Sequence, residues 1–189
     1  MAMQRDDLLK AEDDIKTAID KIKAQMLEQF DEGFAKINAN FQKIFKELFG
    51  GGKAMLQIDY SEVSDRLEAG VEIVAEPPGK KLQKLSLLSG GEKALTAIAI
   101  LFAILRMRPM PFCVLDEIEA ALDEANVDRF ATYLKKFSEE TQFIVITHRK
   151  PTMELADALF GVTMQEKGVS KLVSVKLSDV SELTGEALA

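Results

Sequence analysis

Residues 111–148, PFCVLDEIEAALDEANVDRFATYLKKFSEETQFIVITH, decide the fold. Two short apolar runs, 112–115 and 143–146, flank a segment (123–137) in which Val127, Phe130, Leu134 and Phe137 recur at helical spacing. Fully apolar short runs predict buried parallel strands, and the segment between them predicts the helix that crosses from one strand to the next. We therefore expect an α/β fold built on one right-handed strand–helix–strand unit.

This unit predicts a ligand site at one edge of the sheet. Asp116 and Glu117 follow the first run, and Thr147 and His148 follow the second. Parallel strands bring their carboxyl ends to one edge, where ligands of open α/β sheets bind. An Asp placed for Mg²⁺ beside a Glu that orients a water suits phosphoryl hydrolysis. An exposed acidic turn and a structural histidine are the alternatives.

Residues 88–92, LSGGE, begin an apolar helix expected over 89–107. Ser89 and Glu92 have the spacing of a capping box, which needs neither Gly90 nor Gly91. A glycine costs about 1 kcal/mol relative to alanine inside a helix. Bare backbone N–H groups at a helix start bind anions, so the glycines favour a phosphate site over a plain cap. Asp123 is most simply the N-cap of its own helix.

The other segments extend the α/β prediction. Alternating residues 54–60 and the run 71–76 predict a pair of antiparallel strands, followed by a basic loop over 80–88. Residues 159–164 and 169–177 predict a closing hairpin, and 178–189 form a polar tail. The expected domains are a helical arm (1–48), an α/β lobe (49–177) and this tail.

A single long helix is expected over residues 5–48, where there is no proline and one glycine, Gly33. Its length is roughly 65 Å at 1.5 Å per residue, too long for an ordinary globular helix. Its apolar residues step by three or four and form one stripe: Ile15, Ile19, Ile22, Met26, Phe30, Phe34, Ile37, Phe41, Ile44 and Leu48. We expect the first part to pack on a partner helix and the phenylalanine-rich part to enter a core. A helix lying on its own domain is the alternative.

Composition excludes several classes of protein. The chain has 189 residues, 47% of them hydrophobic, and a net charge of −7, which argues against nucleic-acid binding through bulk positive charge. The longest apolar run, 97–105, is far short of the roughly 20 residues of a membrane span, and no apolar segment near the start suggests a secretion signal. The single cysteine, Cys113, fits a reducing cytoplasm, is expected in the core, and with one histidine leaves no zinc site.

No phosphate loop is present, although Gly-Lys occurs twice, at Gly52-Lys53 and Gly79-Lys80. The loop requires G-x-x-x-x-G-K-[ST]. Glu47 and Val74 stand five residues before the two glycines, and neither lysine is followed by Ser or Thr. Any phosphate cradle of that type must come from another polypeptide segment.

Together these motifs resemble the ATP-binding-cassette (ABC) ATPases. LSGGE is similar to the signature motif, CVLDE (113–117) to the Walker B strand, ALD (121–123) to the D-loop, and His148 to the switch histidine. Residues 85–175 are very similar to the carboxyl-terminal half of the ATPase head of bacterial SMC (structural maintenance of chromosomes) proteins. The resemblance implies the carboxyl-terminal lobe of an ABC-type head, with parallel strands, flanking helices and antiparallel edge strands, preceded by a coiled-coil helix.

The resemblance also implies roles. Asp116 would hold Mg²⁺ through water and Glu117 would position the attacking water. Ser89, Gly90 and Gly91 would grip the γ-phosphate of ATP bound on a second head, and Glu92 belongs to the same ATP-binding set. Asp123 would communicate across that dimer, and His148 would sense the γ-phosphate. The chain would hydrolyse ATP only with the amino-terminal half of the head, which carries the phosphate loop, and would be inactive alone.

The partners implied are that amino-terminal half, a second head in a homodimer, a kleisin subunit, and DNA through the whole complex. The implied location is the cytoplasm, in association with the nucleoid, and the implied process is chromosome condensation and segregation. Two alternatives remain open: a structural coiled-coil adaptor with a degenerate cassette, and a coiled-coil ABC ATPase of DNA repair. An intact motif set disfavours the adaptor, and GVTMQEKGVSKLVSV (161–175) favours SMC over the repair ATPase.

Overall fold

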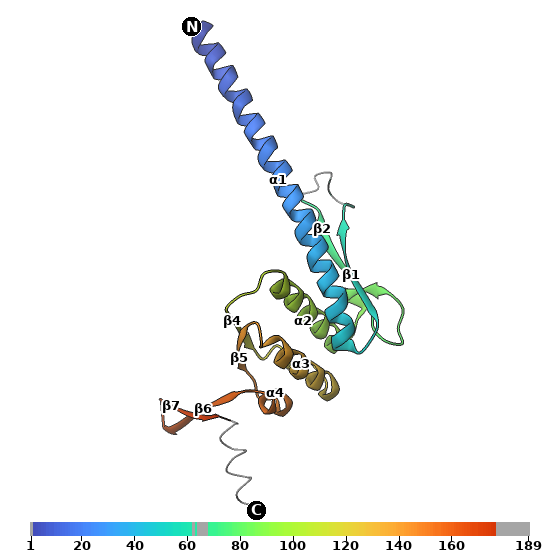
Figure 1. Ribbon diagram of the computed structural model, residues 1–189, viewed down its shortest axis with the longest axis vertical. Coiled ribbons are helices and arrows are strands. Elements are labelled where there is room, and N and C mark those ends of the chain that lie inside the picture. The colour runs from blue at the N-terminus through green and yellow to red at the C-terminus, as the bar shows by residue number, and fades with distance from the viewer. Residues whose placement is uncertain (1, 62, 64–67, 177–189) are drawn as a thin grey trace, which may run out of the picture. The chain divides into compact units, whose positions relative to one another are not determined.

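The computed structural model describes residues 2–61, 63 and 68–176, and Figure 1 shows the order of their elements. The chain divides into two compact units. One comprises Met1–Lys46, Gly50–Leu88 and Ala99–Arg108, and the other comprises Glu47–Phe49, Ser89–Ile98 and Pro109–Ala189. The predicted polar tail, 178–189, lies outside the described residues.

The first unit contains most of α1 (Ala2–Phe49), a single helix of 48 residues, as predicted. Its apolar stripe has two different environments. Ile15 and Ile22 are 61% and 55% exposed, whereas Phe41 and Ile44 are completely buried, as is the neighbouring Phe45. The carboxyl-terminal part of the stripe therefore enters a core, as expected, while the amino-terminal part presents apolar side chains to solvent.

An antiparallel sheet accompanies this helix in the first unit. Strand β1 (Lys53–Asp59) pairs with β2 (Gly70–Glu76) so that Lys53 faces Glu76 and Asp59 faces Gly70. The two-residue β3 (Gln83–Lys84) pairs with β2 and leads into the short 3-10 helix η1 (Leu85–Leu87). The predicted strand pair is confirmed, and a strand and a helical turn occupy part of the expected basic loop.

Backbone contacts fix how the strands enter this unit. Gly52 has a φ of 79°, and a Cβ atom there would lie 2.3 Å from the Glu76 carbonyl oxygen, so only glycine fits. Asn38 of α1 accepts from the Leu56 N–H at 2.9 Å and donates to the Leu56 carbonyl at 3.3 Å. This side chain satisfies both backbone groups of a residue on β1. The core of the unit gathers Phe41, Ile44, Phe45, Ala54, Leu56, Val74, Ala75, Ala99, Phe102, Ala103 and Leu105.

The second unit contains the predicted strand–helix–strand arrangement. Strand β4 (Phe112–Asp116) runs parallel to β5 (Gln142–Ile146), and α3 (Glu124–Phe137) connects them. The prediction is confirmed, and Val127, Phe130, Leu134 and Phe137 are buried as their spacing predicts. Ala131 and Tyr133 are buried as well. The amino-terminal part of α2 (Gly90–Met107) belongs to this unit, as does the short α4 (Lys150–Glu154), which the sequence did not predict.

The expectation that β4 and β5 are buried on both faces is wrong for this chain. Leu115 is 3% exposed, but Val114 and Ile144 are 53% and 50% exposed. Successive side chains of a strand point to opposite faces, so one face of this sheet is covered and the other is open. Two more apolar residues, Phe112 and Ile146, belong to the open face, and Cys113 is half-buried rather than in the core.

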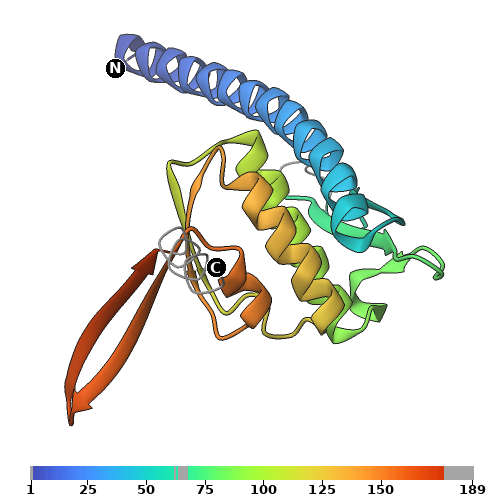
Figure 2. The ribbon, with the colours of Figure 1, turned by 60° about the horizontal axis from the view of Figure 1, so that its bottom comes forward.

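The predicted closing hairpin is also confirmed. Strand β6 (Ala158–Glu166) pairs antiparallel with β7 (Val169–Lys176), and Figure 2 shows them side by side as a two-stranded ribbon. The register shifts between Thr163 and Glu166. Phe160, Val162 and Leu172 are 65%, 73% and 64% exposed, so large apolar side chains of this hairpin face solvent.

Candidate functional site

The end of β4 presents two adjacent carboxylates. Asp116 is the last residue of the strand and faces Ile146 of β5, and both Asp116 and Glu117 are exposed. The Glu117 N–H donates to the Ile146 carbonyl at 2.9 Å, which continues the pairing one residue beyond β4. Among the described residues, Glu117 is the one non-glycine with a positive φ, 47°. This conformation costs roughly 1–2 kcal/mol for an L-residue, so the site maintains local backbone strain at Glu117.

The imidazole of His148 meets this acid pair. His148 follows β5, and its Nδ1 lies 3.3 Å from Glu117 Oε1, with both side chains more than half exposed. The parallel pairing of β4 and β5 puts the two strand ends side by side, as the sequence predicted. The structure thus brings Asp116, Glu117 and His148 to one rim.

The LSGGE segment forms the start of α2 in a form that differs from a full capping box. Glu92 Oε2 accepts from the Ser89 N–H at 3.0 Å and from the Ser89 hydroxyl at 2.7 Å. The hydroxyl therefore donates to a carboxylate instead of accepting from the helix backbone. The Glu92 half of the predicted box is present, and the Ser89 half is not.

The two glycines of this segment have different surroundings. A Cβ atom at Gly91 would lie 3.3 Å from the Ala121 carbonyl oxygen, so close packing on the loop after β4 already favours glycine there. A Cβ atom at Gly90 would meet nothing within 4 Å. Packing therefore explains Gly91, whereas the open space at Gly90 is where a ligand could approach the backbone.

The loop between β4 and α3 ends in the cap predicted from the sequence. Asp123 accepts from the Asn126 N–H at 2.9 Å and is the N-cap of α3. Two turns precede it, closed by bonds from Ala120 to Glu117 and from Leu122 to Glu119. These two turns make up the seven-residue segment from the strained Glu117 to the Asp123 cap.

Sequence reasoning missed a group of residues behind the rim. Glu119 is completely buried and accepts hydrogen bonds from Thr147 and Thr152. Arg149 donates through Nη2 to the Leu122 carbonyl at 2.9 Å. No sequence signal separates Glu119 from the exposed acids beside it, because its burial depends on residues about thirty positions away in the chain.

Cys113 is not an activated thiol. Burial raises its pKa above the ordinary value, which reduces the thiolate fraction at neutral pH. The raised pKa fits a structural thiol on a half-buried strand position.

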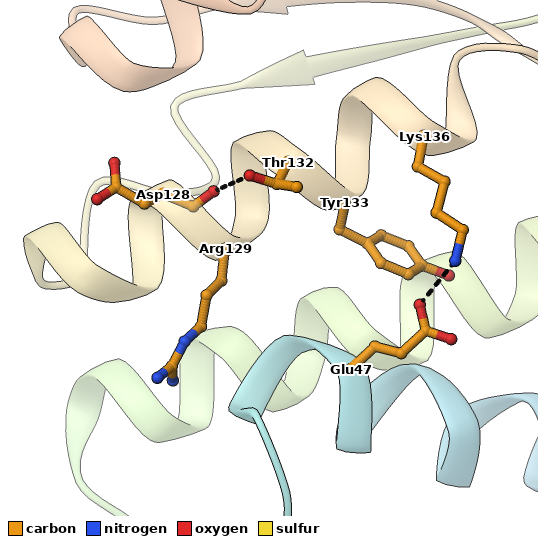
Figure 3. Close-up of a pocket in the computed structure, with 6 residues that line it drawn as sticks. All are labelled: Glu47, Asp128, Arg129, Thr132, Tyr133 and Lys136. Atoms are coloured by element: carbon orange, nitrogen blue, oxygen red, sulfur yellow. Dashed lines mark hydrogen bonds and ion pairs between the residues drawn. The ribbon is translucent and has the colours of Figure 1, made fainter.

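A separate groove of about 400 Å³ lies between the end of α1 and α3 (Figure 3). Lys136 Nζ lies 3.1 Å from Glu47 Oε2, and Arg129 donates to the Phe49 carbonyl at 3.1 Å. None of its lining residues belongs to the motifs above: Glu47, Asp128, Arg129, Thr132, Tyr133 and Lys136. Its polar contacts attach the carboxyl-terminal end of α1 to α3, which is a structural role.

Within the described part of the chain, no group of three or more His, Cys, Asp or Glu residues could hold a metal ion. The described residues therefore do not form a metal site from protein ligands alone. Mg²⁺ at nucleotide sites needs only one or two carboxylates together with phosphates and waters, and the exposed Asp116 carboxylate fits that requirement. The helices in the same described part include none that is long and apolar enough to cross a membrane.

The fold, an α/β lobe that follows a 48-residue helix, is that of the head domains of SMC proteins. Residues 3–171 match the family described as RecF/RecN/SMC N terminal domain, and the chain belongs to this family. It is 58% identical to the Chromosome partition protein Smc of Bacillus subtilis (strain 168) over 182 residues, and 55% identical to that of Desulfitobacterium hafniense (strain Y51) over 177. These alignments cover 96% and 94% of the chain but 15% of each relative.

Solved SMC heads have the same fold. The Smc head domain with an extended coiled coil bound to the C-terminal domain of ScpA, from Pyrococcus furiosus, aligns with a TM-score of 0.81 and 41% identity. That alignment covers 98% of this chain and 46% of the other. An SmcHead bound to the C-winged helix domain of ScpA aligns with a TM-score of 0.71 and 47% identity, over 79% and 45% of the two chains. The resemblance to SMC heads found in the sequence is confirmed.

Proposed function

We propose that this chain supplies the carboxyl-terminal half of an ATP-hydrolysing SMC head that works in chromosome condensation and segregation. One observation carries the proposal: Asp116, Glu117 and His148 gather at one sheet edge in a chain that has no phosphate loop. Such a rim can act on a phosphate anhydride but cannot cradle one. Hydrolysis therefore requires a second polypeptide segment, and the chain alone is inactive.

The rim residues have distinct proposed roles. Asp116 would bind Mg²⁺ through water, and the ion, when bound, supplies positive charge to the phosphates. Glu117 would accept a hydrogen bond from the attacking water and orient it. The exposure of both carboxylates and the 3.3 Å contact of Glu117 Oε1 with His148 Nδ1 support these assignments.

The signature segment would act on ATP held by a second head. The backbone at Gly90 is open to solvent, which suits the approach of a γ-phosphate to the start of α2. Ser89, Gly91 and Glu92 shape that helix start, Asp123 would contact the other head, and His148 would sense the γ-phosphate. Each ATP would then lie between two heads of a homodimer, and hydrolysis would separate them.

The open face of β4–β5 is the proposed contact for the amino-terminal half of the head. Phe112, Val114, Ile144 and Ile146 are each at least half exposed, although their strands have the fully apolar composition of a sheet covered on both sides. Burial by the missing half would remove this apolar area from water. The proposed division of the chain is a coiled-coil arm (1–48), the lobe that meets this half (49–177) and a polar tail (178–189).

Further partners follow from the relatives. Two of the similar structures hold ScpA domains on Smc heads. A third similar structure is of an SMC ATPase and bears on ATP-driven dimerization and DNA stimulated activation. We infer a kleisin subunit as a partner here as well. With a net charge of −7, this chain would contact DNA only as part of the whole complex, in the cytoplasm at the nucleoid.

Co-expression with the amino-terminal half of the same head tests this function. Phosphate release should be absent for the chain alone and appear in the purified two-part head. Rapid turnover by the chain alone would contradict the proposal. A two-part head that neither binds nor hydrolyses ATP would instead indicate the adaptor alternative, a degenerate cassette that binds only protein. A Val114→Lys change should prevent co-purification of the halves, whereas Thr132→Lys, on exposed α3 surface, should not.

A further inference from the structure

A buried carboxylate links the two loops that carry the rim residues. Glu119 lies in the loop between β4 and α3 and is 0% exposed. Its Oε1 accepts from the hydroxyl of Thr147, directly after β5, and from the hydroxyl of Thr152 in α4 at 3.2 Å. We propose that Glu119 is a positioning residue that sets His148 against Glu117; the effect on turnover rests on the function proposed above, and the effect on His148 does not.

Energetics argue that packing alone does not account for Glu119. Burial of a carboxylate costs several kcal/mol unless it is well bonded, and an apolar residue of similar volume is often no less stable at such a position. Here Oε1 has two hydroxyl donors, while the buried Oε2 has no hydrogen-bond partner among the described residues. The required feature is one acceptor oxygen that reaches both threonines.

Arg149 makes a second link between the same loops. Its backbone N–H donates to Thr147 Oγ1 at 3.0 Å, and its guanidinium Nη2 donates to the Leu122 carbonyl at 2.9 Å. Thr147 and Arg149 flank His148 directly in the sequence. The backbone of His148 is thus attached on both sides to the loop over 117–123, whose ends are Glu117 and Asp123.

The two links hold the backbone on either side of His148, while the imidazole itself projects into solvent. His148 is 64% exposed at its side chain, yet Nδ1 lies 3.3 Å from Glu117 Oε1. Loss of the Glu119–Thr147 bond would let the loop after β5 shift relative to Glu117. A displacement of about 1 Å in a catalytic arrangement can cost about 100-fold in rate, so the expected effect falls on kcat. The nucleotide cradle is on the other half, so KM for ATP should change little.

Steady-state kinetics of the two-part head with matched variants test the effect on turnover. Glu119→Leu and Thr147→Val should each lower kcat by roughly 10- to 100-fold, with KM for ATP within about twofold of wild type. Glu119→Gln keeps an acceptor oxygen and should retain most of the activity. Thr132→Val is the control, because it removes an α3 hydroxyl that bonds the Asp128 carbonyl away from the rim. The double variant should be slowed by less than the product of the two single effects, since both changes remove the same Glu119–Thr147 bond.

The NMR spectrum of the imidazole provides a readout that does not need turnover. His148 is the one histidine of the sequence, so an untagged chain gives a single set of imidazole signals. These signals should shift in Glu119→Leu and in Thr147→Val and stay near the wild-type position in Glu119→Gln and Thr132→Val. Thr147→Val preserves side-chain shape and keeps the test available if Glu119→Leu does not fold. Unmoved signals in the folded apolar variants would overturn the positioning role, even if the two-part head proved inactive. An active head whose kcat is unaffected by these variants would overturn the effect on turnover.

Discussion

His148 Nδ1 lies 3.3 Å from Glu117 Oε1, across 31 positions of sequence. The contact exists because β4 and β5 are parallel neighbours and Glu117 extends their pairing by one residue through Ile146. An acid and an imidazole that share a rim can exchange a hydrogen bond with each other or with a ligand between them. The rim residues therefore form one unit whose members can be tested separately.

Glu117→Gln should abolish turnover in the two-part head while ATP binding persists. The amide lacks the charge needed to orient and deprotonate water, and loss of such a group costs about 10²-fold or more. Paired heads should accumulate with ATP, which sedimentation and phosphate release can measure together. Glu139→Gln, an exposed acid beyond α3, is the control. Wild-type turnover by the paired Glu117→Gln heads would remove Glu117 from its proposed role.

Ser89→Arg should prevent head pairing while each head still binds ATP. A long cation at the start of α2 would occupy the space where a phosphate of the second head is proposed to lie. Sedimentation with ATP measures pairing, and a fluorescent nucleotide measures binding. Ser61→Arg, in the segment after β1, provides an exposed serine control. Normal pairing of Ser89→Arg would contradict a phosphate site at this helix start.

Alanine at Gly90 and at Gly91 should give different results. Gly90→Ala has open space, so thermal stability should be maintained or rise slightly while ATP-dependent pairing falls. Gly91→Ala would press on the Ala121 carbonyl, which offsets the gain in helix propensity, so its thermal stability should lie below that of Gly90→Ala. Thermal melting separates the two effects. Unchanged pairing in a stable Gly90→Ala head would leave Gly90 without a ligand role.

Phe130→Ala should destabilise the chain by about 3–5 kcal/mol, because Phe130 is a fully buried ring of α3. Phe160→Ala, at a 65% exposed position of β6, should change stability by less than about 0.5 kcal/mol in the chain alone. Urea denaturation followed by circular dichroism measures both. A comparable loss in Phe160→Ala would mean that the hairpin face is covered in solution.

Alkylation of Cys113 should be slow near pH 7 and should accelerate at higher pH than for a free cysteine. Burial raises its thiol pKa, so the reactive thiolate appears only as pH rises through that raised value. Iodoacetamide labelling from pH 7 to 10, followed by mass spectrometry, gives the profile. Cys113→Ser is the blank, and free cysteine in the same buffer is the reference. A profile at or below that of free cysteine would contradict the shift.

Local patterns explain how much of the fold was predictable. The apolar runs of β4 and β5, the spacing of apolar residues in α3 and the Asp123 cap are each set by residues within a few positions of one another. The neighbourhood of Asp116, Glu117 and His148 followed from the rule that parallel strands end at one edge.

Long-range contacts explain the rest. Glu119 is buried by threonines near the other strand end, and composition cannot say which acid of a run turns inward. The positive φ of Glu117 and the packing of Gly91 on Ala121 depend on the folded loop. The open face of β4–β5 was not foreseen. The apolar composition of a strand indicates that a face is covered, but it does not indicate which polypeptide covers it.

Helix α1 has a mechanical consequence. Its 48 residues span about 72 Å, and about 60 Å of that length precedes Phe41, so a tilt of about 10° at Phe41–Phe45 would move the far end of the helix by roughly 10 Å. The buried rings of Phe41 and Phe45 hold the helix in the core, while the solvent-facing isoleucines lie along the part that precedes them. A small change in the direction of α1 near these buried rings would therefore displace its amino-terminal end by a much larger distance.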